Sequence, residues 1–292
     1  MTAPAQPADE FLGQVHPLTV AGLPDGYEYG VTRYADVILQ RAFPGRFENL
    51  REALDKFEPT LDELIAGGGA RTAFVKRFDD SLAEIREHGQ EVWGKQNITI
   101  QKALGLAGDV APVSRVRGHE IDIFGVGSLD RPLPGIAVEM EWNNKDPFFD
   151  RDLINFQALH REGAIAVGVI VTRGPELQTL ISSVIGAAGR SSKYGASTTH
   201  WDKLIPRINL GGGGECPLLL VGIQPARIEG IERAHEARAE LDALEQMVRD
   251  WPERFESRKS AEAEAKIQKN EVLRRLNESP EQQTAAMPEG QE

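Results

Sequence analysis

Runs of apolar residues along the centre of the chain predict four β-strands. Residues 120–125 (EIDIFG) and 135–142 (GIAVEMEW) alternate apolar and acidic positions, as strands with one polar face do. Residues 164–172 (AIAVGVIVT) and 216–223 (CPLLLVGI) are continuous apolar runs, which are typical of strands buried on both faces. The pattern therefore indicates a sheet with a covered centre.

Helical periodicity surrounds these strands. Apolar residues recurring every three to four positions predict helices over 33–57, 72–90, 150–163 and 175–186. Residues 92–104 read as a turn followed by an element that the pattern does not define. Strands alternating with helices predict an α/β fold, with a central mixed sheet flanked by helices on both faces.

The ends of the chain differ in composition from its centre. Residues 1–10 are rich in Pro and Ala, and we expect them to be mobile. Residues 11–224 are expected to form one α/β domain with N-terminal helices. A helical extension is predicted over 225–277, interrupted at Pro252, and a disordered tail over 278–292.

Composition narrows the class of protein. A hydrophobic content of 40% in 292 residues supports a globular core, and the chain has no apolar run long enough to span a membrane. The N-terminus lacks the basic and apolar regions of a signal peptide, so none is expected. Cys216 is the single cysteine, which fits a reducing, cytoplasmic compartment.

The net charge of −12 by itself argues against a nucleic-acid partner. However, charge is unevenly distributed. Within 190–207 the cations Arg190, Lys193, Lys203 and Arg207 face only one acid, Asp202, which gives a local charge of +3. A locally basic loop can contact phosphates even on an acidic protein.

Three acids in the two alternating strands carry the clearest chemical signal. Glu139 and Glu141 lie two residues apart and therefore share one strand face, while Val138 and Met140 point the other way. If the two strands pair, Asp122 joins them. Converging carboxylates repel each other unless a cation lies among them, and hard oxygen ligands suit Mg²⁺. Such acids can equally be solvated surface carboxylates.

Longer motifs resemble those of a known nuclease family. The stretch EMEWNNKDPFFDRDLINFQALHREGAIAVGVIVTRG follows the acids, SKYGASTTHWDKLIPRINLGGGGECPLLLVGI occupies 192–223, and VWGKQNITI precedes both. In this order they resemble the BglII-type restriction endonucleases of the PD-(D/E)XK nuclease superfamily. The resemblance covers about 90–225 and implies a restriction-endonuclease-like core, so that 11–224 would be the catalytic domain.

The resemblance implies roles for individual residues. Asp122 matches the first metal-binding aspartate of the family and Glu139 its second metal ligand. Glu141 stands where most of the superfamily has lysine and where this family uses glutamine or glutamate. Trp93 and Asn97 match a Trp…Asn-Ile pattern, so that Asn97 would orient a metal-bound water; it is also explained as a turn-capping asparagine.

Two departures from the family pattern affect these roles. Ile121-Asp122 replaces the usual Pro-Asp, and the loop between the two strands is lengthened and contains Asp130, a turn residue by its context. Without the superfamily lysine the general base is open. Glu141 could deprotonate the water, or it could only bind water outside the metal shell.

Candidate DNA contacts follow the acids. Lys145 could reach the scissile phosphate or be an ordinary surface lysine, and Arg151 could contact phosphate. Asp150 and Asp152 are explained by the helix dipole alone. The segment SKYGASTTHWDKLIPR (192–207) either reads DNA bases or caps a helix. The candidate base contacts are Ser197, Thr198, Thr199, Asp202 and Lys203, and the candidate phosphate contacts are Arg190, Lys193 and Arg207.

As a whole, the resemblance implies a Mg²⁺-dependent type II restriction endonuclease. It would act as a homodimer on palindromic double-stranded DNA, leave 5′-phosphate ends, and favour a GATC core. A separate methyltransferase chain would protect the host DNA. Two alternatives stay open: a repair or structure-specific nuclease of the same superfamily, and a non-catalytic scaffold protein with a degenerate nuclease core.

Overall fold

A computed structural model describes most of the chain, namely residues 16–18, 20–66, 72–106, 109–189, 194–195 and 197–278. These residues form two compact units. The first draws its residues from 1–57, 75–175 and 197–224, and the second from 58–74, 176–196 and 225–292. All the predicted catalytic acids belong to the first unit. The predicted domain bounds stay a prediction.

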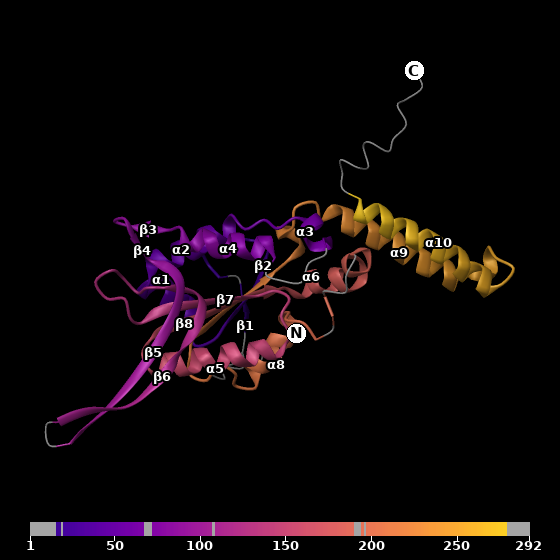
Figure 1. Ribbon diagram of the computed structural model, residues 1–292. Coiled ribbons are helices and arrows are strands. Elements are labelled where there is room, and N and C mark those ends of the chain that lie inside the picture. Colours follow the sequence, from indigo (N-terminus) through magenta and orange to yellow (C-terminus); the bar gives the residue numbers. More distant parts are fainter. Residues whose placement is uncertain are drawn as a thin grey trace, which may run out of the picture. The chain divides into compact units, whose positions relative to one another are not determined.

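Within the described residues, seven strands form one mixed sheet in the first unit (Figure 1). Their order across the sheet is β1 (His16–Leu18), β2 (Tyr27–Val31), β9 (Leu218–Ile223), β8 (Ile165–Arg173), β7 (Gly135–Glu141), β6 (Asp109–Gly125) and β5 (Trp93–Leu106). β7, β8 and β9 run parallel to one another, and the remaining neighbours pair antiparallel.

Helices lie on both faces of this sheet. Figure 1 shows α5 (Pro147–Arg161) and α8 (Trp201–Asn209) on one side, and α1 (Ala35–Ala42), α2 (Pro44–Asp55) and α4 (Ala73–Ala83) on the other. The arrangement confirms the predicted fold class, a restriction-endonuclease-like core with a central mixed sheet and N-terminal helices.

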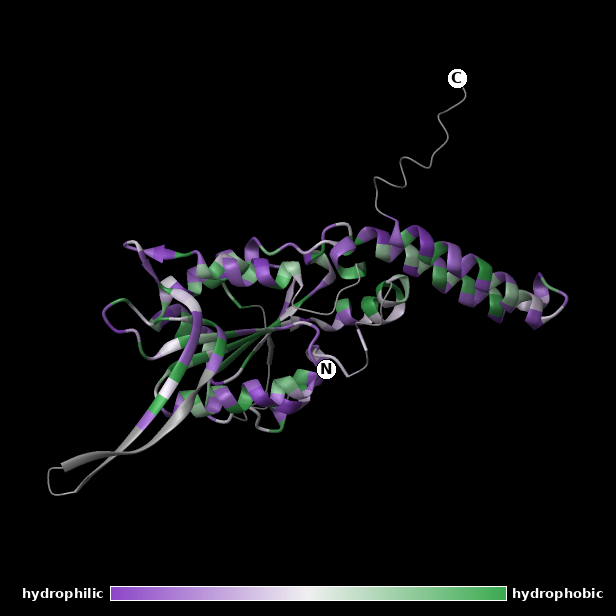
Figure 2. Ribbon diagram, in the orientation of Figure 1, coloured by the Kyte–Doolittle hydropathy of each residue, from purple (hydrophilic) through white to green (hydrophobic). Residues whose placement is uncertain are grey.

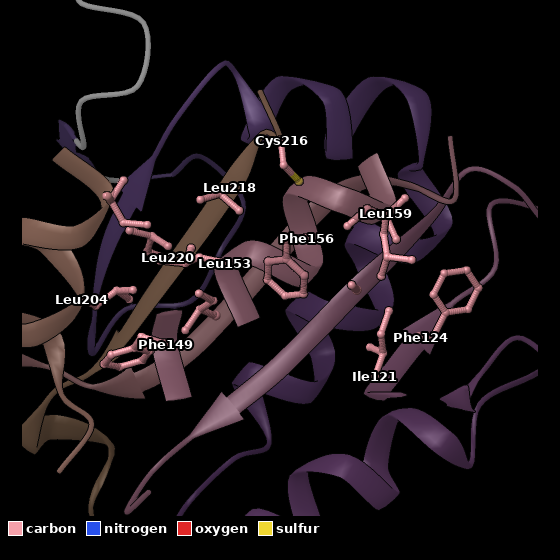
Figure 3. Packing of buried hydrophobic residues seen from close by; sticks show 14 of the residues in the cluster. Ile121, Phe124, Phe149, Leu153, Phe156, Leu159, Leu204, Cys216, Leu218 and Leu220 are labelled. Atoms are coloured by element: carbon pink, nitrogen blue, oxygen red, sulfur yellow. The ribbon is translucent and has the colours of Figure 1, made fainter. Parts of the chain in front are cut away.

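The core between α5 and the sheet is built from the apolar stripe that the sequence shows. Phe149, Leu153 and Phe156 of α5 are buried and pack with residues of β6 and β9 (Figure 3). Figure 2 shows the central strands as largely hydrophobic. A Cβ atom at Gly168 of β8 would lie only 2.4 Å from Phe156 Cδ2, so the glycine permits this close approach.

The helices predicted near the N-terminus need two corrections. The helix expected over 33–57 is two helices, because the chain breaks at Phe43 and restarts at Pro44, a residue suited to the first helical turn. The helix expected over 72–90 ends at Ala83. Residues after it form a hairpin of β3 (Arg86–Glu87) and β4 (Gln90–Glu91), whose two-residue turn has positive φ angles of 49° and 80°.

The element that the sequence left undefined over 92–104 is β5. It forms a long antiparallel hairpin with β6, and three register shifts interrupt the pairing. Figure 1 shows this hairpin reaching well past the ends of the other strands. Its β6 strand is much longer than the predicted strand over 120–125, and the residues of that predicted strand that pair with β7 are Ile123, Phe124 and Gly125.

The second unit is helical. It contains α3 (Leu61–Ile65), the continuous turns of α6 (Pro175–Leu180), η1 (Ile181–Ile185, a π-helical segment) and α7 (Gly186–Ala188), the 3₁₀ turns η2 (Pro225–Arg227) and η3 (Trp251–Glu253), and the helices α9 (Glu232–Arg249) and α10 (Arg258–Asn277).

α9 and α10 pack against each other, and their buried residues are small or apolar, namely Ala234, Ala237, Leu241, Ala261, Val272 and Leu276. They confirm the predicted C-terminal helical extension, and Pro252 lies in the turn between them. None of the helices in the described ranges is long and apolar enough to cross a membrane.

Candidate active site

The predicted acids lie where β6 and β7 run side by side. The antiparallel register pairs Ile123 with Val138, so one step further Asp122 lies opposite Glu139. The backbone amide of Asp122 accordingly donates to Glu139 Oε1 over 3.4 Å. Strand pairing thus brings together two acids that are 17 residues apart in the sequence.

Strand alternation directs the two glutamates of β7 toward α5. Ala137 belongs to the core cluster packed beneath that helix, and Glu139 and Glu141 follow it on the same face. The side chains of Glu139 and Glu141 are only 4% and 2% exposed, whereas that of Asp122 is 46% exposed. The site therefore has a buried side under α5 and an open side at β6.

A fourth carboxylate, Asp152 of α5, joins the buried side. It is 1% exposed, and its negative charge acts on both Glu139 and Glu141. The sequence interpretation assigned Asp152 to the helix dipole and missed this position. A signal was present, because Asp152 falls on the same helical stripe as the buried residues Phe149 and Phe156.

Burial controls the ionisation of these acids. Removal from water, and to a smaller extent the negative charges of Asp152 and Asp122, raise the pKa of Glu139 to about 9. The pKa of Glu141 is raised to about 8, again by burial first and by Asp152 second. The pKa of Asp152 is also raised, with burial as the largest cause. Without a cation, Glu139 and Glu141 therefore hold protons near neutral pH.

Two polar neighbours orient Glu141. Asn144 Nδ2 donates to Glu141 Oε2 over 2.7 Å, and Arg151 Nη2 lies 3.4 Å from Glu141 Oε1. Arg151 also pairs with Asp152 Oδ1 at 2.7 Å and lies over the ring of Phe148 at 4.5 Å. Asn144 was not predicted. Arg151, predicted as a phosphate contact, is here half-exposed and paired with carboxylates at the edge of the site.

The remaining upstream candidate lies on β5. Asn97 is exposed and pairs with Glu120 of β6, two residues before Asp122. Its neighbour Lys95, which the sequence interpretation did not single out, forms an ion pair with Glu120 and lies 3.9 Å from Asp122 Oδ1. β5 therefore presents a polar edge beside the open side of the site.

The segment predicted to read bases is hydrogen-bonded to the loop that follows the acids. The amide of Asp146 donates to Ser197 O over 2.8 Å, and the amide of Thr199 donates to Asn144 O over 2.8 Å. Lys145, which is exposed, forms an isolated β-bridge with Thr198. The structure thus places Ser197, Thr198 and Thr199 next to Lys145, directly beyond β7.

A buried arginine of the sheet, Arg173, holds the segment 197–199 in place. Arg173, the last residue of β8, donates to Thr198 Oγ1 over 2.7 Å and to Thr199 O over 3.1 Å through Nε. Thr199 is buried, Thr198 is partly buried, and Ser197 is exposed. Sequence reasoning read Arg173 as part of a family motif and did not identify this contact, which joins residues 25 and 26 positions apart.

The other predicted DNA contacts lie on α8 or outside the described residues. Asp202 is exposed, Lys203 Nζ lies 3.9 Å from Asp146 Oδ2, and Arg207 Nε donates to Asp150 Oδ1 over 2.8 Å. Arg190 and Lys193 fall outside the part of the chain that the structure describes.

Several of these acids are of the kind that binds divalent cations. Within the described ranges, however, no group of three or more histidine, cysteine, aspartate or glutamate side chains is arranged so that it could hold a metal ion. The acids instead form a cluster with a buried and an open side, in which Asp122 and Glu139 are linked directly.

Comparison with known proteins gives one result that bears on this cluster. A family model described as restriction endonuclease BglII/BglIII matches residues 27–223, more than half of the chain. The match begins at the first residue of β2 and ends at the last residue of β9, so it includes all the acids described above. A search among curated proteins found no match to the chain.

Proposed function

Because the chain belongs to the BglII/BglIII restriction endonuclease family, and is therefore a nuclease acting on DNA, we propose that it is a Mg²⁺-dependent type II enzyme. It cleaves double-stranded DNA at a specific sequence and leaves 5′-phosphate ends. The observation that carries this proposal is the convergence of Asp122, Glu139, Glu141 and Asp152 where β6 and β7 meet α5.

The residues present fit a divalent cation. Asp122 and Glu139 would hold it, since carboxylate oxygens are the preferred ligands of Mg²⁺. Two features of the chain support this assignment. The pKa of Glu139 is raised to about 9 and that of Glu141 to about 8, so both hold protons near neutral pH when no cation is bound, and the carboxyl group of Glu139 accepts a hydrogen bond from the Asp122 amide. A bound Mg²⁺ would polarise the phosphodiester and make water a better nucleophile.

Glu141 is the proposed proton acceptor. Its carboxylate is held by Asn144 on one oxygen and approached by Arg151 on the other, so its position is defined before the reaction. A pKa raised to about 8 makes the ionised carboxylate of Glu141 a stronger base than that of an ordinary glutamate. Asn97, on the exposed edge of β5, would orient the attacking water beside Asp122.

We assign the recognition of the DNA sequence to the segment that lies next to this site, around residues 197–203. Ser197, Thr198, Thr199, Asp202 and Lys203 are the proposed base contacts, with Lys145, Arg151 and Arg207 on phosphates. Arg190 and Lys193 are also proposed phosphate contacts. A homodimer would match a palindromic site, for which a core of GATC is proposed. A cognate methyltransferase would be a separate chain.

Incubation of the full chain with unmethylated phage DNA tests the proposal. With Mg²⁺ we expect discrete fragments whose sequenced ends share one motif and carry 5′-phosphates, and with EDTA no cleavage. A smear, or cleavage at branched junctions alone, would instead identify a repair nuclease. Asp122→Asn should abolish the fragments, whereas Asp130→Asn, in the loop between β6 and β7, should leave them unchanged. If Asp122→Asn cleaved the DNA as fast as the wild type and gave the same fragments, the proposed active site would be rejected.

A further inference from the structure

Lys95 of β5 has no role in the function proposed above, yet it lies beside one of the proposed active-site acids. Its Nζ lies 3.9 Å from Asp122 Oδ1 and forms an ion pair with Glu120, two residues before Asp122 on β6. The side chains of Lys95 and Glu120 are both more than half exposed. Because an exposed ion pair contributes little to stability, the fold alone does not explain a lysine at this position.

An irregularity in the sheet brings this lysine to the aspartate. The register of β5 and β6 shifts at Lys95, so that this one residue lies opposite two residues of β6, Asp122 and Ile123. Two residues opposite one form a β-bulge, which redirects side chains and is frequent next to active sites. Ile123 is buried and Asp122 is half-exposed, so the bulge leaves the aspartate on the open side of the site with the lysine.

Lys95 and Arg151 serve different sides of the acid cluster. Arg151 contacts Glu141 and Asp152, whose side chains are buried under α5. Lys95 lies on the open side, where its own side chain is 58% exposed and that of Asp122 is 46% exposed. A DNA strand is too large to enter the buried side. A phosphate that reaches Asp122 therefore approaches from the open side, where it meets Lys95.

We propose that Lys95 is a further catalytic residue, whose ammonium group contacts the scissile phosphate beside Asp122. The inference rests on the proposed function, because it concerns the same reaction. A lysine binds phosphate as a point charge, so it needs proximity but no forked geometry. Glu120 holds the ammonium group at the open side of the site before the DNA binds.

The reaction explains why a cation is useful at this place. In the proposed hydrolysis the water oxygen bonds to phosphorus while the bond from phosphorus to the 3′ oxygen breaks. Glu141 accepts a proton from the water, and the 3′ oxygen takes a proton from solvent. Negative charge develops on the oxygens around phosphorus in the transition state, and Lys95 stabilises it. Loss of one group that stabilises such charge typically lowers the rate by about 100- to 1000-fold.

Single-turnover cleavage of phage DNA by an excess of the full chain in Mg²⁺ tests this role. Lys95→Gln removes the charge, and we expect it to cut at the same positions with a rate constant about 100-fold lower. Lys76→Gln is the matched control, because Lys76 of α4 is exposed and also forms an ion pair, with Asp80. The control should cut as fast as the wild type. Cleavage by Lys95→Gln at the wild-type rate would overturn the inference.

A variant of the partner acid separates a phosphate contact from an ion pair that only supports the strands. Glu120→Gln breaks the ion pair and keeps the lysine, so it should lose far less activity than Lys95→Gln. Lys95→Arg keeps the charge and should recover part of the lost rate. If Glu120→Gln is as slow as Lys95→Gln, the lysine acts through its ion pair and the inference is wrong.

Binding in EDTA gives a measurement that a structural lysine would not change. The probes are two duplexes with the site found from the fragment ends, one with an ordinary phosphate and one with an uncharged methylphosphonate at the cleaved position. The wild type should lose affinity when the phosphate is replaced, and Lys95→Gln should lose clearly less. Equal losses in the two proteins would contradict the contact.

The wild type keeps the two proposals apart. If it yields discrete fragments and Lys95→Gln cuts equally fast, only the inference about Lys95 fails. If the wild type does not cleave DNA in Mg²⁺, the proposed function and the inference fail together.

Discussion

Glu139→Gln should stabilise the metal-free protein, and increasingly so as the pH rises. The ordinary pKa of a glutamate is 4.5, and burial raises that of Glu139 to about 9. Between these values the unfolded chain is ionised at this position while the folded chain holds the proton. The unfolded state therefore binds fewer protons, and the free energy of unfolding falls as the pH rises. Below the unfolded pKa the loss is absent, and above about pH 9 it is complete.

The size of the effect follows from the shift. One pH unit within the window corresponds to about 1.4 kcal/mol, so raising the pH from about 5 to about 8 should cost the wild type roughly 4 kcal/mol at this residue. Glutamine does not ionise in this range, so the variant does not lose this part of its free energy of unfolding as the pH rises. Because folded Glu139 is neutral throughout that range, the substitution leaves the charge felt by Glu141 and Asp152 unchanged, and the comparison isolates one group.

Urea unfolding in EDTA, followed by circular dichroism at the two pH values, measures the effect. The difference between variant and wild type should be small at about pH 5 and favour the variant by a few kcal/mol at about pH 8. Asp130→Asn, an exposed loop acid, should show no such dependence. Saturating Mg²⁺ should reverse the order, because it binds the folded wild type more tightly. A difference that is independent of pH, or a variant that is less stable at the higher pH, would refute the reasoning.

Three further outcomes are expected. Asp122→Asn should reduce the rate of DNA cleavage by about 100-fold or more, measured on the fragments of phage DNA against Asp130→Asn. Gly168→Ala should lower the free energy of unfolding by about 1–3 kcal/mol in urea, since the added Cβ would lie 2.4 Å from Phe156. Arg173→Lys should keep the fold but lose the forked contact with Thr198 and Thr199; a changed cleavage pattern with unaltered Mg²⁺ affinity would support its role, and an unchanged pattern would contradict it.

Local patterns were sufficient for much of the fold and part of the site. The alternation in GIAVEMEW predicted that Glu139 and Glu141 share a face, and the structure places both toward α5. The continuous apolar runs predicted β8 and β9, which are buried along nearly their whole length. These inferences worked because strand periodicity and burial are encoded within a few residues.

The features that the sequence did not predict depend on contacts between residues that are far apart in the chain. Asp152 carries both a dipole explanation and a place on the buried stripe of α5, and only the packing of that helix on β7 shows which of the two matters. The helix predicted over 72–90 was too long, because its last residues form a hairpin whose turn residues, His88 and Gly89, adopt positive φ angles that apolar periodicity does not reveal. Similarly, the contact of Lys95 with Asp122 depends on an irregular register between β5 and β6.

Contacts between distant residues would also connect the proposed DNA-reading segment to the proposed proton acceptor, Glu141. Asn144 donates through its side chain to Glu141 and accepts through its carbonyl from the amide of Thr199. A displacement of the segment 197–199 therefore cannot leave Asn144 unaffected, and a displaced Asn144 changes the hydrogen bond that holds Glu141. Arg173, at the end of β8, opposes such a displacement through its hydrogen bonds to Thr198 and Thr199. The proton acceptor of the proposed reaction is thus held in part by the segment that would touch the bases, so a poor fit to DNA at that segment would act directly on the position of Glu141.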